Sequence, residues 1–242
     1  HTRFKCDWSS DVCSSDLIPE YRDETEVLLT QLPLGGSQYK KWRYDSEQRR
    51  PVCEWIPIDS MLLPYSTTNF YTAQRVTEVQ DITEDVYRQR IDQGIYRDLD
   101  NMNYSSDLDA DQQTRAKQAN DKIEGISAPS KNVDGVRRIY EITCFLRLDD
   151  DSESEGKRAP YILTIDETSS QVLALYRNWA FGDEKLTKLD WYVEYKFIPW
   201  RGAYAIGLPH LIGGLSAALT GSLRALLDAA HINNSQTKIG RA

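Results

Sequence analysis

The chain has 242 residues, of which 37 are acidic and 29 are basic, so its formal charge is −8. Apolar residues make up 40% of the sequence, which is too many for a wholly disordered chain, and the acidic balance excludes a general nucleic-acid binder. Four cysteines are too few for a disulfide framework at this length. The length allows one large or two small domains with a real hydrophobic core.

The first seventeen residues resemble a translated sequencing adapter. Residues 7–17 read DWSSDVCSSDL, which matches one reading frame of a common short-read index adapter, and the initial HTR matches the adapter bases upstream. A Ser-rich tail is the alternative interpretation. We expect residues 1–17 to be artefactual and the natural gene to extend further upstream. The other 225 residues carry a charge of −7 and two cysteines, Cys53 and Cys144, whose apolar strand-like surroundings predict buried free thiols.

The first part of the remaining chain predicts one amphipathic segment and three strands. Gly35 and Gly36 interrupt the pattern after the first segment, and Pro57 and Pro64 favour an edge strand for the third. The segments are 27–32 (amphipathic), 39–44 (half-buried strand), 55–63 (edge strand) and 75–80 (alternating strand).

A helix is predicted next, with start and stop signals at both ends. The sequence DITE at 81–84 has the pattern of a capping box, and the helix should continue to about Gln93. Ile82 is placed to contact Val86 as a hydrophobic staple, and Gly94 is the expected C-terminal stop.

Residues 98–135 are almost entirely polar and predict a long surface excursion with one short helix near 111–124. Alternating strands follow at 136–148, at 161–166 with 171–179 as a hairpin, and at 189–199. On the strand at 136–148, one face carries Tyr140, Ile142, Cys144, Leu146 and Leu148. The acidic run 149–155 is interpreted as a solvated turn. The order of elements predicts an α+β fold: an antiparallel meander sheet with flanking helices and a C-terminal helix rich in small residues.

The segment 202–223 contains no charged residue, and from about Leu208 small residues recur every fourth position. The candidate packing or oligomer face is formed by Gly213, Ala217, Gly221 and Ala225. Leu215, Leu219 and Leu223 form the adjoining ridge. We interpret the segment as a tightly packed helix, with a membrane span as the alternative. Packing within the chain is slightly favoured over packing between subunits.

Motifs for catalysis, cofactors or metals are missing from the sequence. No HExxH, Walker, GxGxxG or GxSxG pattern occurs, and only His210 and His231 lie outside the first seventeen residues. Asp107, Asp109 and Asp111 suggest a calcium loop, but the required Gly and Glu positions hold Gln112 and Gln118. We therefore assign no catalytic, cofactor-binding or metal-binding residue and expect a protein that is not an enzyme.

Five blocks together resemble, in order, the portal protein of short-tailed bacteriophages. The resemblance covers nearly all of residues 27–242, and no single block is a catalytic signature. The blocks are 32–78, 82–98 (ITEDVYRQRIDQGIYRD), 136–149 (VRRIYEITCFLRLD), 160–179 (PYILTIDETSSQVLALYRNW) and 192–230. One departure lies in the hairpin turn, where a glycine would be expected near Ser170, so that Ser170 must adopt any positive φ itself. Family chains are also longer than this one.

The resemblance implies a homo-oligomeric ring of typically twelve subunits at one capsid vertex, which forms the channel for packaging and ejecting DNA. It implies as partners the terminase large subunit, capsid and scaffold proteins, tail adaptor proteins and double-stranded DNA that passes through the channel without sequence specificity, and no membrane. The location would be the virion, and the host cytoplasm during assembly. Residues 18–205 would form an α+β domain like the portal wing or hub, including the excursion at 98–135, and residues 206–242 would begin a truncated helical region.

Two alternatives to a portal fragment remain. The first is a fragment of a hydrolase or nucleotide-processing enzyme whose active site lies in a missing part of the protein. The second is a membrane-associated module that uses residues 202–223.

Overall fold

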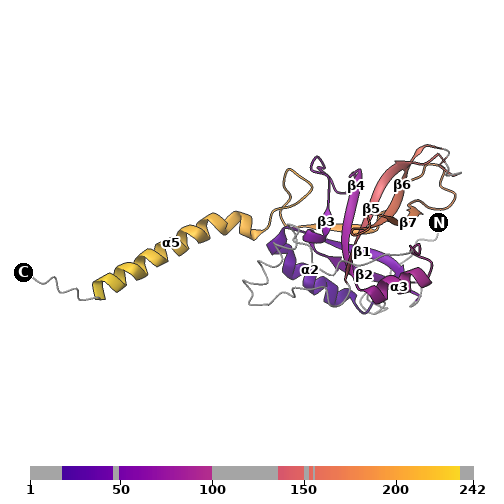
Figure 1. Ribbon diagram of the computed structural model, residues 1–242. Coiled ribbons are helices and arrows are strands. Elements are labelled where there is room, and N and C mark those ends of the chain that lie inside the picture. Colours follow the sequence, from indigo (N-terminus) through magenta and orange to yellow (C-terminus); the bar gives the residue numbers. More distant parts are fainter. Residues whose placement is uncertain (1–17, 46–48, 100–135, 150–152, 155, 235–242) are drawn as a thin grey trace, which may run out of the picture. The chain divides into compact units, whose positions relative to one another are not determined.

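The computed structural model describes residues 18–45, 49–99, 136–149, 153–154 and 156–234 (Figure 1). It contains helices and antiparallel sheets, which confirms the α+β class. The chain divides into two compact units, one formed by residues 1–58 with 192–242 and the other by residues 59–191. The adapter-like segment and the predicted helix at 111–124 lie outside the described residues. The domain boundary expected at 205/206 stays a prediction.

The first unit contains a three-stranded antiparallel sheet in the order β2-β1-β8. Its strands are β1 (Ser37–Asp45), β2 (Arg50–Ile56) and β8 (Tyr192–Lys196), and its helices are α2 (Tyr21–Gly35) and α5 (Leu208–Asn234). The expectation that β8 continues the meander is wrong, because Tyr39 pairs with Ile56 on one side and with Glu194 on the other. Alternation of residues identifies a strand but does not specify its partner.

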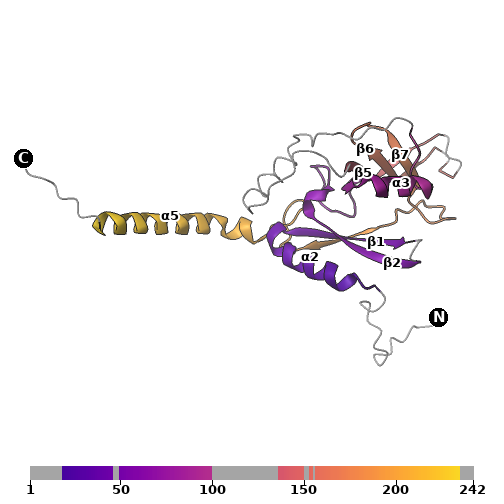
Figure 2. The same ribbon diagram turned by 60° about the horizontal axis from the view of Figure 1, so that its bottom comes forward.

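Helix α2 lies along β1 and β2 (Figure 2) and ends where the two glycines predict. Gly36 has a φ of 84°, and its N–H donates to the Leu32 carbonyl oxygen at 2.9 Å. The outer edge of β2 is closed by α2, because Glu24 Oε2 accepts a hydrogen bond from the Trp55 backbone N–H at 2.7 Å. This contact covers the exposed edge of β2. The single edge strand expected at 55–63 is wrong, because β2 ends at Ile56, before Pro57, and a 3-10 turn at Ile58–Ser60 separates it from a two-residue strand at Met61–Leu62.

Strand β1 is more deeply buried than the half-buried pattern predicted for it, since Ser37 to Lys41 are all buried. The two faces are covered by different segments. Lys40 points toward α2, where its Nζ lies 2.5 Å from Thr25 Oγ1 and 4.2 Å from the centre of the Tyr21 ring. Ser37 lies on the other face, and its hydroxyl oxygen accepts a hydrogen bond from the Ala205 N–H at 2.8 Å.

The second unit contains a five-stranded antiparallel sheet in the order β3-β4-β5-β6-β7. Its strands are β3 (Met61–Leu62), β4 (Arg75–Ile82), β5 (Arg137–Arg147), β6 (Arg158–Asp166) and β7 (Val172–Arg177), and the 3-10 turn η1 (Ile58–Ser60) precedes them. Strands β5 to β7 confirm that part of the predicted meander, and β4, which was predicted as a strand outside it, pairs with β5. The hairpin turn between β6 and β7 contains Ser170 with a φ of 54°. Ser170 thus adopts the positive φ that was predicted for this position, where a glycine would be expected.

The face of β5 that the sequence pattern selected is only half-buried. The deepest burial is on the opposite face, at Arg137, Ile139 and Thr143. The pattern identified the more apolar face, but α3 (Glu84–Asp92) and the segment that follows it cover the other one.

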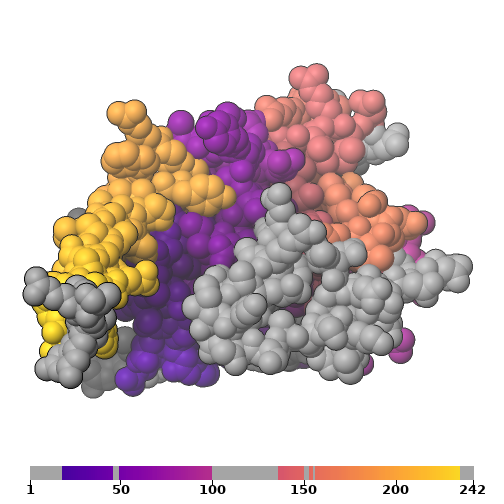
Figure 3. Space-filling view, turned by 60° about the vertical axis from the view of Figure 1, so that its left-hand side comes forward, coloured from indigo at the N-terminus to yellow at the C-terminus, as the bar shows by residue number. Residues whose placement is uncertain are grey.

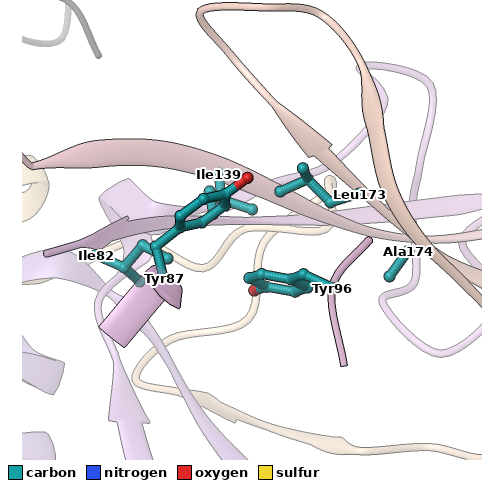
Figure 4. Packing of buried hydrophobic residues seen from close by; sticks show 6 residues of the cluster. All are labelled: Ile82, Tyr87, Tyr96, Ile139, Leu173 and Ala174. Carbon is teal, nitrogen blue, oxygen red and sulfur yellow. The ribbon is translucent and has the colours of Figure 1, made fainter. Parts of the chain in front are cut away.

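The core of this unit gathers around α3 (Figure 4). Tyr87 and Tyr96 lie beside Ile82, Ile139 and Leu173 in one buried cluster, which also contains Ala174. The predicted capping box is wrong: Thr83 is the N-cap residue and makes no side-chain cap hydrogen bond, while Asp81 belongs to β4. The staple partner of Ile82 is therefore Tyr87, because the helix starts two residues later than the motif suggested, and Val86 is exposed. Gly94, with a φ of 72°, follows the end of the helix as predicted.

Candidate oligomerisation helix

Immediately before α5, the backbone of the chain packs directly against the backbone at the end of α2. A Cβ atom added to Gly207 would lie 2.5 Å from the Leu34 carbonyl oxygen and 2.6 Å from that of Pro33. A Cβ added to Gly36 would lie 2.5 Å from the Ala205 carbonyl oxygen. Only glycine fits at either position, so the end of α2 and the start of α5 approach as closely as backbones can.

Further hydrogen bonds hold the same crossing together. The Phe197 N–H donates to the Gly36 carbonyl oxygen at 2.8 Å, and the Ile206 N–H donates to the Ile198 carbonyl oxygen at 3.0 Å. Together with the bond from Ala205 to Ser37, these contacts fix the chain immediately before α5 to the three-stranded sheet. The helix therefore has a well-defined base.

Beyond its base, α5 is exposed at every described position. It spans 27 residues and contains no buried residue, which corresponds to a length of about 40 Å. The space-filling view shows its side chains, in yellow, at the surface (Figure 3). Among the residues that the structure describes, no segment buries this helix, so the packing within the chain that the sequence slightly favoured is not found there.

The exposed surface of α5 is strongly apolar. Leu215 is 74% exposed, Leu226 is 67% exposed and Leu219 is 61% exposed. Nine large apolar side chains of this helix are exposed in all: Leu208, Leu211, Ile212, Leu215, Leu219, Leu223, Leu226, Leu227 and Ile232. Contiguous apolar surface of this kind marks an interaction site in a native protein. Burying these side chains lowers the free energy, and exposure to water does not.

These large residues lie mainly on one side of α5. At about 100° per residue, the positions from Leu208 to Leu226 that carry leucine or isoleucine fall within an arc of about 120°. We call this side the leucine face; it comprises Leu208, Leu211, Ile212, Leu215, Leu219, Leu223 and Leu226. No charged residue lies on it.

The four site residues predicted from the sequence lie on the other side of the helix. We call this side the small-residue face; it comprises Gly213, Ala217, Gly221 and Ala225. Cβ atoms added to Gly213 or Gly221 would meet no heavy atom within 4 Å. Both faces are therefore open in the part of the chain that the structure describes.

Polar groups of α5 are compatible with burial against a partner. Thr220 Oγ1 donates to the Ser216 carbonyl oxygen at 2.9 Å, and Ser222 Oγ donates to the Ala218 carbonyl oxygen at 3.0 Å. Because both hydroxyls are satisfied inside the helix, covering them would leave no donor unpaired. Arg224 and Asp228 are the only residues with a full charge on α5, and both lie away from the leucine face.

A second notable group, which the sequence patterns did not reveal, is a buried polar pair between β1 and β8. Tyr39 is fully buried opposite Glu194. Burial raises the pKa of Tyr39, and the nearby Glu194 carboxylate adds to this effect. Burial also raises the pKa of Glu194, against the opposing effect of Lys196, whose Nζ lies 3.1 Å from its Oε2. The only signal in the sequence is a glutamate in a strand pattern, which usually faces solvent.

The described residues contain no cluster of three or more His, Cys, Asp or Glu side chains placed to hold a metal ion. No helix among them combines the length and hydropathy needed to cross a bilayer. Cys53 is a buried free thiol as predicted, whereas Cys144 is only half-buried. Burial raises the pKa of both thiols.

No protein-family model matches the chain, and a search of curated proteins finds no match either.

Proposed function

We propose that this chain is a structural subunit of a homo-oligomeric ring of the viral portal type, in which α5 contributes to the contact between subunits. The observation that carries the proposal is the uncovered surface of α5, with nine large apolar side chains exposed along 27 residues. A helix of this composition requires a partner, since burying each such side chain is worth about 1.5–3 kcal/mol.

The portal type of ring is supported by the five sequence blocks that resemble that family. A ring requires two different faces on each subunit, so that one face docks on the other face of the neighbour. The acidic charge of the chain also suits a channel through which DNA moves, because each phosphate neutralised by the protein would add affinity and slow sliding. The terminase large subunit, capsid and scaffold proteins and tail adaptors are proposed partners on the strength of the same resemblance.

Substitution of two exposed leucines tests the role of α5. We expect the wild-type chain to form rings that are visible by negative-stain electron microscopy, and the double variant Leu215→Glu/Leu219→Glu to sediment as a monomer with an unchanged circular dichroism spectrum. Leu29→Glu is the matched control, because Leu29 is an exposed helical leucine (59%) on α2. A wild-type chain that is monodisperse and monomeric at micromolar concentration would contradict the proposal.

A further inference from the structure

We propose that neighbouring subunits pack α5 against α5 in one specific way: the leucine face of one copy lies on the small-residue face of the next. This inference rests on the proposed ring and specifies its contact. The occupant of the leucine face is a second copy of this chain, because the complementary surface for it is present on the same helix.

Shape is the first argument for this pairing. The leucine face is a ridge of long side chains, and it is exposed from Leu208 to Leu226. Gly213, Ala217 and Gly221 present almost no side chain beyond the backbone, and the added Cβ atoms at the two glycines meet open space. A ridge of leucines fits such a groove, whereas two leucine ridges facing each other would leave both small-residue faces uncovered.

The angle between the two faces is the second argument. The mean directions of the leucine face and the small-residue face differ by roughly 160° around the helix axis. Identical helices standing side by side in a closed ring of n copies need faces 180° − 360°/n apart, which is about 150° for twelve copies. The separation is compatible with a wide ring, and it excludes a small closed bundle of three or four helices.

Polarity agrees with this arrangement. The leucine face has no charged residue, whereas Arg224 and Asp228 lie within the small-residue face, toward its C-terminal end. The hydroxyls of Thr220 and Ser222 are already paired within their own helix, so the contact buries no unsatisfied donor. Cyclic symmetry makes adjacent α5 helices run in the same direction, which places Leu219 at a height between those of Ala217 and Gly221 of the next copy.

Crosslinking between single-cysteine variants tests the pairing. Cys6, Cys13 and Cys144 are changed to serine in the full chain, while Cys53 is fully buried and is left in place. Leu219→Cys and Gly221→Cys are prepared separately and treated with a short bismaleimide, alone and after mixing and reassembly. We expect covalent dimers in the mixture and none with either variant alone. A mixture of Leu29→Cys with Gly221→Cys is the control and should give no dimer.

The possible outcomes separate this inference from the proposed ring. Dimers formed by Leu219→Cys alone would show that leucine faces pair with each other and would overturn the inference. Rings in the micrographs without mixed dimers would also overturn it while leaving the proposed function standing, whereas monomers throughout would contradict the ring itself. Ala217→Leu adds a second test: filling the groove should abolish ring formation with the leucine face intact, and rings that survive it would contradict the pairing.

Discussion

At two glycines at the base of α5, Gly36 and Gly207, an added methyl group would collide with a backbone oxygen and so lower the stability of the fold. We expect Gly207→Ala to lower the free energy of unfolding by about 1–3 kcal/mol, because its Cβ would lie 2.5 Å from a backbone oxygen that cannot move aside. The matched control is Gly214→Ala, which lies in open space within α5 itself and should raise helix stability by up to about 1 kcal/mol. Urea titrations followed by circular dichroism measure both, and equal effects would contradict the close crossing.

The buried carboxyl group of Glu194 makes the stability of the fold depend on pH. Because burial raises the pKa of its carboxyl above the ordinary value of 4.5, the folded state binds more protons than the unfolded state in that range. The contribution of Glu194 to stability therefore falls as the pH rises from 4.5 through its raised folded pKa. We expect Glu194→Gln to remove this fall, so that its stability relative to wild type is higher at pH 7 than at pH 4.

Urea titrations at several pH values measure this difference, with the exposed Glu184→Gln as control. A variant that loses more stability at pH 7 than at pH 4 would instead indicate that the ion pair with Lys196 outweighs the cost of burial.

At the scale of elements, α3 is joined to β5 by one buried ion pair. Arg137, whose side chain is 2% exposed, donates from Nε to Glu84 Oε2 at 2.7 Å, and its guanidinium lies 4.6 Å from the centre of the Tyr87 ring. Glu84→Ala would leave a buried cation without this carboxylate, and we expect it to lower the free energy of unfolding by about 2–4 kcal/mol. Asp85→Ala is the matched control, because Asp85 is an exposed acid in the same first turn and should cost less than about 1 kcal/mol. Thermal unfolding measures both variants, and equal losses would show that only the helix dipole matters.

Local signals predicted most elements correctly and their partners less well. The glycines at 35, 36 and 94 and the strained Ser170 were all predictable, because a turn constrains φ at a single residue. The capping box failed because Asp81 continues β4, where its carboxylate accepts a hydrogen bond from Arg138, more than fifty residues further along the chain. Glu84 pairs with the neighbouring Arg137. The same limitation explains β8 and the burial of β1: both depend on segments distant in sequence, which alternation within a strand does not encode.

For α5 as well, the helix could be predicted from nearby residues, whereas its exposure depends on residues distant in sequence. The spacing of small residues predicted a helix and its two faces, and the structure has a helix from Leu208. What the spacing could not supply is whether the rest of the chain covers that helix. The exposure of Leu215 and Leu219 is a property of the folded chain, and it is the observation on which the proposed packing against another copy rests.

At the scale of the whole molecule, each compact unit contains one cysteine among its described residues, and this thiol can report on the unfolding of its own unit. Cys53 lies in the first unit and Cys144 in the second, and burial raises the pKa of each. In a Cys6→Ser/Cys13→Ser chain, we expect Glu84→Ala to accelerate maleimide labelling of Cys144 by about tenfold or more while leaving Cys53 unchanged, because only the second sheet is destabilised. Peptide mass spectrometry after timed labelling measures both sites. Equal acceleration at both thiols would show that the units open together.

The pairing of β1 with β8 also dictates an order of events during synthesis. Residues 59–191 form one continuous unit, whereas the first sheet needs β8, which leaves the ribosome about 150 residues after β1. The second unit can therefore fold while one edge of β1 still lacks its strand. The hydrogen bonds that hold the start of α5 to the first sheet, from Phe197 to Gly36 and from Ala205 to Ser37, can therefore form only after residues 59–191 have been synthesised.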